Sequence, residues 1–139
     1  MEKSIQNIVH AHEFMVEKVE SVSPDLSIFN AINLLLKKRI SGVPVVENDK
    51  VVGILSSKDC LNIALECKYQ NYCFGDVKDY MSTEVIGVRP EADLFEIIEL
   101  FDKKGLRRLP VIDEEGHLKG IISRNDVLKK LLEEKTWLT

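Results

Sequence analysis

The sequence predicts an α/β (α+β) fold built from two repeats of one strand-helix-strand-strand-helix unit, related by a pseudo-twofold axis. Two observations lead to this prediction. The chain matches itself when it is shifted by 66 positions, and the spacing of apolar residues changes in the same order in both copies. Because the matching positions include turn residues and a late Ser-x-x-Asp, they indicate a duplicated supersecondary unit rather than a chance apolar run.

The repeat sets the expected organisation of the chain. At the offset of 66 the equivalent pairs are Met15 and Met81, Val19 and Val85, Pro24 and Pro90, Phe29 and Phe95, and Pro44 and Pro110. One extra residue changes the offset to 67, and the pairs are then Gly53 and Gly120, Ser56 and Ser123, and Asp59 and Asp126. We therefore expect a first repeat with an N-terminal lead-in over residues 1–66, a linker over residues 67–76 and a second repeat over residues 77–135.

Each repeat begins with a predicted strand and a predicted helix. Residues 19–22 and 85–88 have strand character, and a proline closes each run. The helix after each run has apolar residues at spacings of three and four, which is typical of one buried face. Ser27 and Asp93 stand where an N-cap is expected. The two apolar stripes are Ile28, Ala31, Ile32 and Leu35, and Leu94, Ile97, Ile98 and Phe101.

A predicted hairpin and a second helix complete each repeat. Apolar runs over residues 43–46 and 51–55 flank the turn Asn48-Asp49, and runs over 109–112 and 118–122 flank a turn at 114–116. The second helices are expected to begin near Ser57 and Arg124. Their apolar residues are Leu61, Ala64 and Leu65 in the first copy and Val127, Leu128, Leu131 and Leu132 in the second.

The composition indicates a soluble, cytoplasmic protein without affinity for nucleic acid or membranes. The 139 residues are 45% hydrophobic, and no apolar run approaches the ~20 residues of a membrane span. The 23 acidic and 19 basic residues are interspersed and give a net charge of -4, whereas nucleic-acid binding needs a dense basic face. Cys60, Cys67 and Cys73 lack a metal or redox spacing, so we expect reduced thiols, with Cys60 in the core. A bridge between Cys67 and Cys73 is conceivable but not expected in a reducing compartment.

Each first helix carries more apolar residues than one buried face can hold. The surplus residues are Phe29, Leu34 and Leu36 in one copy and Phe95 and Leu100 in the other. These side chains either contact the sister repeat or are covered by a second subunit. We favour a homodimer.

The order of elements and the paired motifs resemble a tandem cystathionine-β-synthase (CBS) domain pair, also called a Bateman module. The resemblance spans residues 8–135 and rests on Gly-Ile-Leu-Ser-Ser-Lys-Asp at 53–59 and Gly-Ile-Ile-Ser-Arg-Asn-Asp at 120–126. These segments follow Val-Pro-Val-Val and Leu-Pro-Val-Ile strands. The resemblance implies a regulatory module that binds AMP, ADP, ATP or S-adenosylmethionine in crevices between the repeats and signals to an effector protein.

The resemblance implies a first crevice around Ser56, Lys58 and Asp59, in which the Asp59 carboxylate holds the two ribose hydroxyls. Guanidinium groups beside such a site suit a phosphorylated ligand, because each can grip phosphate oxygens through two N–H groups. The other residues of this crevice would be Thr83 and Val85 near the base, and Arg107 and Arg108 near the phosphate.

A second crevice would use Ser123, Arg124 and Asp126. The residues from the first copy would be Glu17, Val19, Ser41 and Gly42. This copy departs from the pattern, because Ser41-Gly42 replaces the arginine pair and Glu17 stands at the position equivalent to Thr83. A carboxylate there repels phosphate, so we expect this crevice to hold an uncharged adenosine moiety or nothing.

Simpler interpretations of the same residues remain open. Asp59 and Asp126 also suit the first turn of a helix, and Arg107 and Arg108 could form surface ion pairs with Asp113 or Glu114. Under these interpretations the chain is a ligand-free dimerisation or scaffold module.

The string His10, His12 and Glu13 superficially resembles a metal-binding motif. No further ligand stands at a suitable spacing, so we expect a solvated lead-in helix and no metal site. The chain contains no nucleophile elbow, phosphate-binding loop, dinucleotide fingerprint or zinc-protease motif, and we do not expect an enzyme.

Overall fold

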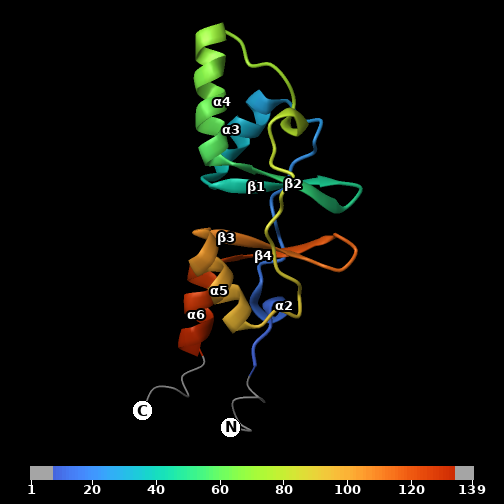
Figure 1. Ribbon diagram of the computed structural model, residues 1–139, viewed down its shortest axis with the longest axis vertical. Coiled ribbons are helices and arrows are strands. Elements are labelled where there is room, and N and C mark those ends of the chain that lie inside the picture. The colour runs from blue at the N-terminus through green and yellow to red at the C-terminus, as the bar shows by residue number, and fades with distance from the viewer. Residues whose placement is uncertain (1–7, 134–139) are drawn as a thin grey trace. The chain divides into compact units, whose positions relative to one another are not determined.

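The computed structural model describes residues 8–133 and contains two compact units, each considered separately (Figure 1). One unit comprises Glu20–Val85, and the other combines the chain up to Val19 with the chain from Ile86 onward. The elements confirm the predicted α/β fold and its duplicated unit. In chain order they are α2 (Ala11–Phe14), α3 (Ile28–Lys38), β1 (Gly42–Glu47), β2 (Lys50–Ser56), α4 (Ser57–Gln70), η1 (Val77–Asp79), α5 (Leu94–Lys104), β3 (Arg108–Ile112), β4 (Leu118–Ser123) and α6 (Arg124–Glu133).

The unit Glu20–Val85 is built on an antiparallel hairpin of β1 and β2, with α3 and α4 beside it (Figure 1). The predicted turn is confirmed, and Asn48 and Asp49 both have positive φ, at 52° and 65°. Two consecutive left-handed residues are what a tight hairpin turn requires. The buried core comprises Val22, Ile28, Ala31, Leu35, Val43, Val45, Leu55, Cys60, Ile63 and Val77.

The other unit repeats this arrangement with β3 and β4 as the hairpin and α5 and α6 beside it (Figure 1). Leu109 lies opposite Ile122 in the register, and both side chains are fully buried. Its core also includes Ala11 from the lead-in. The other buried members are Val88, Ala92, Ile97, Phe101, Val111 and Val127.

The predicted first helices and their caps are confirmed. Ser27 Oγ accepts a hydrogen bond from Asn30 N–H at 3.2 Å, and the Asp93 carboxylate accepts one from Glu96 N–H at 3.0 Å. Each bond satisfies a backbone donor that the first turn of a helix leaves without a partner. The buried stripe residues are Ile28, Ala31 and Leu35 in α3 and Ile97 and Phe101 in α5.

The second helices begin where predicted, and α6 buries Val127 as expected, but α4 buries a different face from the one that Leu61 and Leu65 suggested. In α4 the buried residues are Cys60 and Ile63, whereas Leu61 and Leu65 are exposed. The helix continues to Gln70, so residues 67–70 of the expected linker are helical. The leucines of α4 are therefore surface residues.

The strands predicted over residues 19–22 and 85–88 are wrong in extent. Each run contributes one isolated parallel bridge, from Val22 to Val45 and from Val88 to Val111. Val22 N–H donates to Pro44 O at 3.1 Å, and a turn closed by Leu26 N–H to Ser23 O follows at once. The chain turns away before a second residue can pair.

The segment before each of these bridges belongs to the unit of the other repeat. Val16 and Ile121 exchange two backbone hydrogen bonds of 2.9 Å in one unit. Ser82 and Ile54 do the same in the other unit. The two compact units therefore differ from the two sequence repeats, because each unit takes the segment that opens the other repeat.

The expectation of reduced thiols is wrong for two of the three cysteines. Cys67 and Cys73 form a disulfide with an S–S distance of 2.11 Å. The reason lies at the end of α4, where Asn71 adopts a left-handed conformation and Tyr72 N–H donates to Cys67 O at 3.1 Å. This reversal returns the chain to Cys67. Cys60 is a buried free thiol, as predicted, and burial raises its pKa.

Within the described residues, no helix combines the length and the apolar character needed to cross a bilayer.

Candidate functional site

The first Ser-x-x-Asp lies at the start of α4. Asp59 N–H donates to Ser56 Oγ at 3.2 Å, and Ser56 Oγ–H donates to Asp59 Oδ2 at 2.9 Å. Both side chains are half-buried, and Lys58 between them is exposed. The serine is therefore the N-cap of α4, and the carboxylate fixes the direction of its hydroxyl.

The second Ser-x-x-Asp makes an equivalent pair at the start of α6. Asp126 N–H donates to Ser123 Oγ at 3.1 Å, and Ser123 N–H donates to Asp126 Oδ2 at 2.8 Å. These are the two reciprocal bonds of a capping box. Asp126 thus has the capping role that the simpler interpretation proposed, whereas Asp59 accepts a hydrogen bond from the hydroxyl of the capping serine.

The observed hydrogen bonds engage only one of the two oxygens of each carboxylate. In both pairs the bonds engage Oδ2, and in the described part of the chain Oδ1 of neither Asp59 nor Asp126 has a hydrogen-bond partner. A carboxylate oxygen has two lone pairs and can accept a hydroxyl while its neighbour holds the cap. The observed caps are compatible with ligand contact.

Arg107 and Arg108 lie beside the second Ser-x-x-Asp in the same unit. Arg108 opens β3 opposite Ser123, the last residue of β4. Arg124 N–H donates to Arg107 O at 3.3 Å, and Arg124 Nε donates to Leu106 O at 2.8 Å. The backbones of all three arginines therefore lie together at the start of α6, where the helix dipole also favours an anion.

The ion pairs that the simpler interpretation assigned to Arg107 and Arg108 are not formed among the described residues. Glu114 instead pairs with Arg89 at 3.2 Å. The Asp113 carboxylate accepts hydrogen bonds from the backbone of His117 and Glu115, and these bonds lower its pKa. The acidic groups that were candidates to neutralise the arginines have other partners.

The other residues expected to line the first crevice do not all belong to the same unit. Thr83 and Val85 belong to the same unit as Asp59, one and three residues beyond the bridge of Ser82 to Ile54. Thr83 is exposed and Val85 is half-buried. The arginine pair belongs to the other unit. Its assignment to Asp59 stays a prediction.

The other residues expected to line the second crevice also belong to two different units. Glu17 and Val19 belong to the unit of Asp126, just after the bridge of Val16 to Ile121. Ser41 and Gly42 belong to the other unit, where Gly42 lies opposite Ser56 and Ser57 N–H donates to Ser41 O at 2.8 Å.

The hairpin accounts for these local groupings, which the sequence analysis missed. An antiparallel hairpin places the residue that opens its first strand beside the residue that ends its second strand. The arginines before β3 must therefore meet the serine after β4, and Ser41-Gly42 must meet Ser56. The predicted strand bounds already contained this signal.

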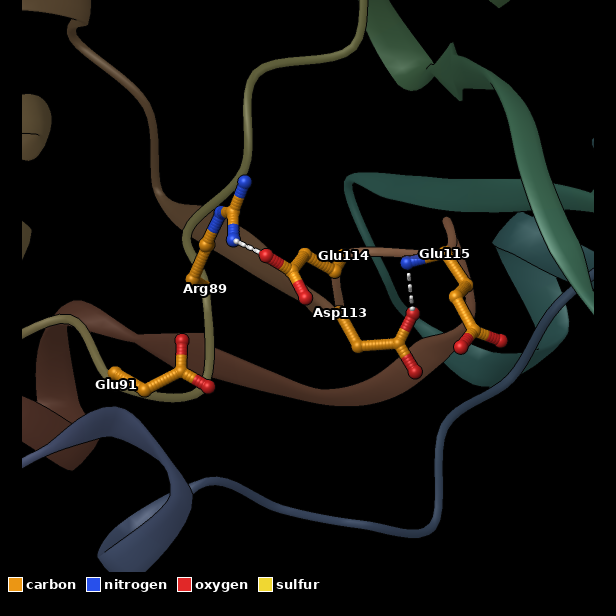
Figure 2. Close-up of a pocket in the computed structure, with 5 residues that line it drawn as sticks. All are labelled: Arg89, Glu91, Asp113, Glu114 and Glu115. Carbon is orange, nitrogen blue, oxygen red and sulfur yellow. Dashed lines mark hydrogen bonds and ion pairs between the residues drawn. The ribbon is translucent and has the colours of Figure 1, made fainter.

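A surface pocket of about 300 Å³ lies apart from the predicted site residues (Figure 2). Arg89 is the one basic residue in the lining of this pocket, and its guanidinium group forms an ion pair with Glu114. A pocket with this excess of carboxylates repels phosphate. The other lining residues are Glu91, Asp113 and Glu115.

The fold and the paired capping motifs define the class of protein as a tandem α/β repeat with one Ser-x-x-Asp per unit. The family model for the CBS domain matches residues 11–66 and 77–133. The chain therefore belongs to the CBS domain family and is a tandem CBS pair, or Bateman module.

The chain is similar in sequence to part of two longer proteins, both of them dehydrogenases. Inosine-5'-monophosphate dehydrogenase of Methanocaldococcus jannaschii is 37% identical over 127 residues, which is 91% of this chain and 24% of the dehydrogenase. That of Aquifex aeolicus is 32% identical, over 92% of this chain and 26% of the enzyme. The chain thus spans about a quarter of the length of these relatives.

Solved structures support the same relationship. The CBS-pair protein CBSX2 of Arabidopsis thaliana, in a crystal structure with AMP, is 29% identical with a TM-score of 0.79. The alignment covers 91% of this chain and 98% of that one. The cytosolic domain of the Mg²⁺ channel MgtE, in complex with ATP, is 25% identical with a TM-score of 0.73, over 87% of this chain and 48% of that one.

Proposed function

We propose that this chain is a regulatory module that binds an adenosine-containing ligand, with AMP as the first candidate, and signals to an effector protein. The observation that carries the proposal is the cluster of Arg107, Arg108 and Arg124 beside Ser123 and Asp126. AMP and ATP in two structural relatives support the ligand class. ADP and S-adenosylmethionine belong to the same class and are tested alongside them.

Each part of the cluster suits a different part of the ligand. The guanidinium groups of Arg107 and Arg108 are exposed, and the described residues offer them no ion-pair partner. They can therefore grip a phosphate through paired N–H groups. The unoccupied Oδ1 of Asp126 can accept a ribose hydroxyl. In the other unit, Asp59 with Lys58 provides a second ribose site, in which Ser41-Gly42 stands in place of the arginine pair.

Signalling requires that the ligand bind two shapes of the protein unequally. A ligand with equal affinity for both shapes shifts no population, however tightly it binds. We propose that ribose and phosphate contacts favour one shape, which the effector protein recognises. The chain then acts through ligand binding rather than catalysis.

Calorimetric titration of the full chain with AMP and 2′-deoxy-AMP tests the ribose contact. Asp126→Ala is expected to weaken the binding of AMP by about 1–3 kcal/mol, because the substitution leaves ribose hydroxyls without a hydrogen-bond partner. The deoxy analogue should bind the parent protein weakly, and its affinity should change little in Asp126→Ala. Equal affinity of the parent for both nucleotides would refute the proposed contact.

Asp59→Ala is the matched comparison, because it removes the aspartate at the equivalent position of the other repeat. If Asp59→Ala alone weakens AMP binding, Asp59 rather than Asp126 holds the ribose. If both variants bind AMP as the parent does, the aspartates only cap helices. A parent chain that binds none of AMP, ADP, ATP and S-adenosylmethionine would favour the ligand-free scaffold, which is the second candidate function and is also compatible with the observed caps.

We further propose that the module forms a homodimer through its helices. The surface apolar residues recur at equivalent positions of the two repeats, with Phe29 at 57% and Phe95 at 86% exposure. Leu61 and Leu65 on α4, and Leu128 and Leu132 on α6, are likewise exposed one helical turn apart. Exposed apolar stripes of this kind are typical of a surface that another subunit covers.

Sedimentation equilibrium of a Leu61→Gln and Leu128→Gln double variant tests the dimer. We expect the parent to be dimeric and the double variant monomeric with an unchanged melting temperature, because exposed leucines contribute little to the core. A matched variant carries Gln at the polar surface positions Glu66 and Lys129 and should remain dimeric. A monomeric parent would contradict the proposal.

A further inference from the structure

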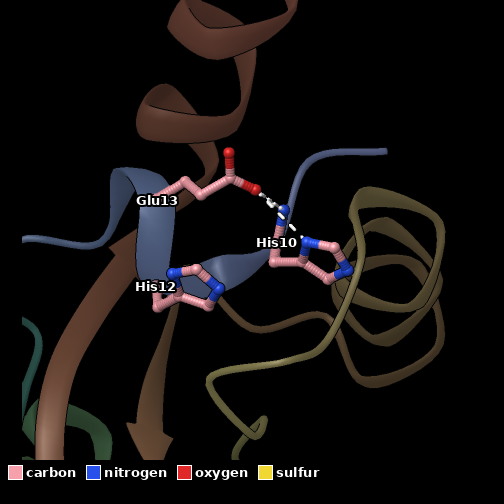
Figure 3. Close-up of side chains that lie close together, drawn as sticks. All are labelled: His10, His12 and Glu13. Atoms are coloured by element: carbon pink, nitrogen blue, oxygen red, sulfur yellow. Dashed lines mark hydrogen bonds and ion pairs between the residues drawn. The ribbon is translucent and has the colours of Figure 1, made fainter. Parts of the chain in front are cut away.

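The lead-in turn gathers three metal-ligating side chains that the sequence analysis judged to be solvated (Figure 3). The donor atoms of His10, His12 and Glu13 all lie within 4.8 Å of one another. The two imidazole rings are stacked, with centroids 5.7 Å apart and planes inclined by 3°. Glu13 Oε2 lies 3.2 Å from His10 Nδ1. Glu13 thus contributes a third donor atom to the cluster.

We propose that His10, His12 and Glu13 form a binding site for a divalent transition-metal ion, with zinc as the reference ion. Two imidazoles and one carboxylate are a common donor set for zinc, with water in the remaining position. Imidazole nitrogen also favours zinc, copper and nickel over magnesium and calcium, which prefer oxygen.

The backbone explains how histidines two positions apart reach the same ion. In a regular helix, residues at this spacing do not face each other. His10 instead precedes α2 in an extended conformation, with φ -107° and ψ 156°, and His12 lies within the helix. The change of conformation between them brings their rings together on one side of the turn (Figure 3).

The turn that carries the cluster is fixed to its own unit. Ala11 is fully buried, and its N–H donates to Ala92 O at 2.8 Å. His12 N–H donates to Pro90 O at 3.0 Å. Both histidines are therefore attached to backbone with defined partners, while their rings project outward.

The equivalent turn of the other repeat shows which of the three residues the fold itself requires. At that turn Asp79 Oδ2 accepts a hydrogen bond from Asp76 N–H at 2.8 Å, as Glu13 Oε2 does from His10 N–H at 2.6 Å. The capping box thus explains Glu13. It does not explain the histidines, because Asp76 stands in place of His10 and Lys78 in place of His12.

Binding requires a modest contraction of the cluster. Ligands at the 2.0–2.2 Å typical of zinc are separated by roughly 3.5 Å in a tetrahedral site. Because all donor atoms lie within 4.8 Å of one another, no pair must approach by more than about 1.3 Å. The side chains of His10 and Glu13 are 39% and 41% exposed, so rotation about their side-chain bonds can supply this movement.

Zinc titration of the full, tag-free chain, in competition with a chromophoric chelator, tests the site. We expect one ion per chain, and loss of about tenfold or more in affinity for His12→Gln. The His12 ring has no hydrogen bond within the described residues, so this change leaves the turn intact. His117→Gln is the matched control and should bind zinc as the parent does, because it removes the third histidine of the chain.

NMR spectroscopy of the histidine rings reports on zinc binding at individual residues, and it does so without any nucleotide. Zinc should shift the NMR signals of the His10 and His12 rings and leave those of His117 unchanged. No saturable binding, equal affinity in His12→Gln and the parent, or shifts confined to His117 would each overturn the proposal.

Discussion

Replacing Arg107 and Arg108 together by alanine is expected to weaken AMP binding by about 2–3 kcal/mol, or a factor of about 30–150 in Kd. The backbone of Arg107 and Arg108 lies beside the start of α6, and the described residues provide the two exposed side chains with no carboxylate partner. A phosphate bound there gains charge-assisted hydrogen bonds, and alanine removes them. Calorimetric titration of the parent and the double variant measures the loss.

Adenosine provides the internal control, because it lacks the phosphate. Its affinity should be the same for the parent and the double variant. Arg89→Ala is the matched protein control, since Arg89 is an exposed arginine of the same unit that pairs with Glu114. An equal loss for adenosine, or a loss as large in Arg89→Ala, would contradict a phosphate role for the arginine pair.

Gly53→Ala is expected to destabilise the protein by about 1–3 kcal/mol, the usual cost of overpacking. A Cβ at Gly53 would lie 2.6 Å from Met81 Sδ and 2.9 Å from Ser82 O. The sulfur can move, but the carbonyl belongs to the backbone bridge between Ser82 and Ile54. Chemical denaturation followed by circular dichroism measures the change.

Gly42→Ala is the matched control within the same hairpin. There the nearest atom to an added Cβ is Leu55 O at 3.4 Å, so we expect a change within about 0.5 kcal/mol. Equal effects of the two substitutions would show that the segment at Met81 and Ser82 does not restrict the space beside Gly53.

The sequence determined those features that depend on neighbouring residues. The apolar stripes place Ile28 and Ile97 in the two cores, because helical spacing alone selects the buried face. The caps at Ser27 and Asp93 need a polar side chain only three residues from the N–H that it accepts. The hairpin turn at Asn48-Asp49 also follows from local conformational preference. Duplication strengthened each prediction, because every signal occurred twice.

The candidate site followed from the sequence only in part. Paired Ser-x-x-Asp motifs and the arginine pair were visible as residue types, and the caps they form were an open alternative. Their grouping depends on strand register, which places Arg108 opposite Ser123. The resemblance to a CBS pair assigned the arginines to the crevice of Asp59, and that assignment stays a prediction.

Only the tertiary structure decided which segments share a unit. The exchange of the opening segments rests on the bridges of Val16 to Ile121 and of Ser82 to Ile54, whose partners are far apart in the chain. The meeting of Cys67 with Cys73 and of His10 with Glu13 depends on changes of backbone conformation at a helix end. Residue spacing selected the buried faces of α3 and α5, but it does not specify a pairing between distant segments. Such pairings are set by the packing of the whole chain.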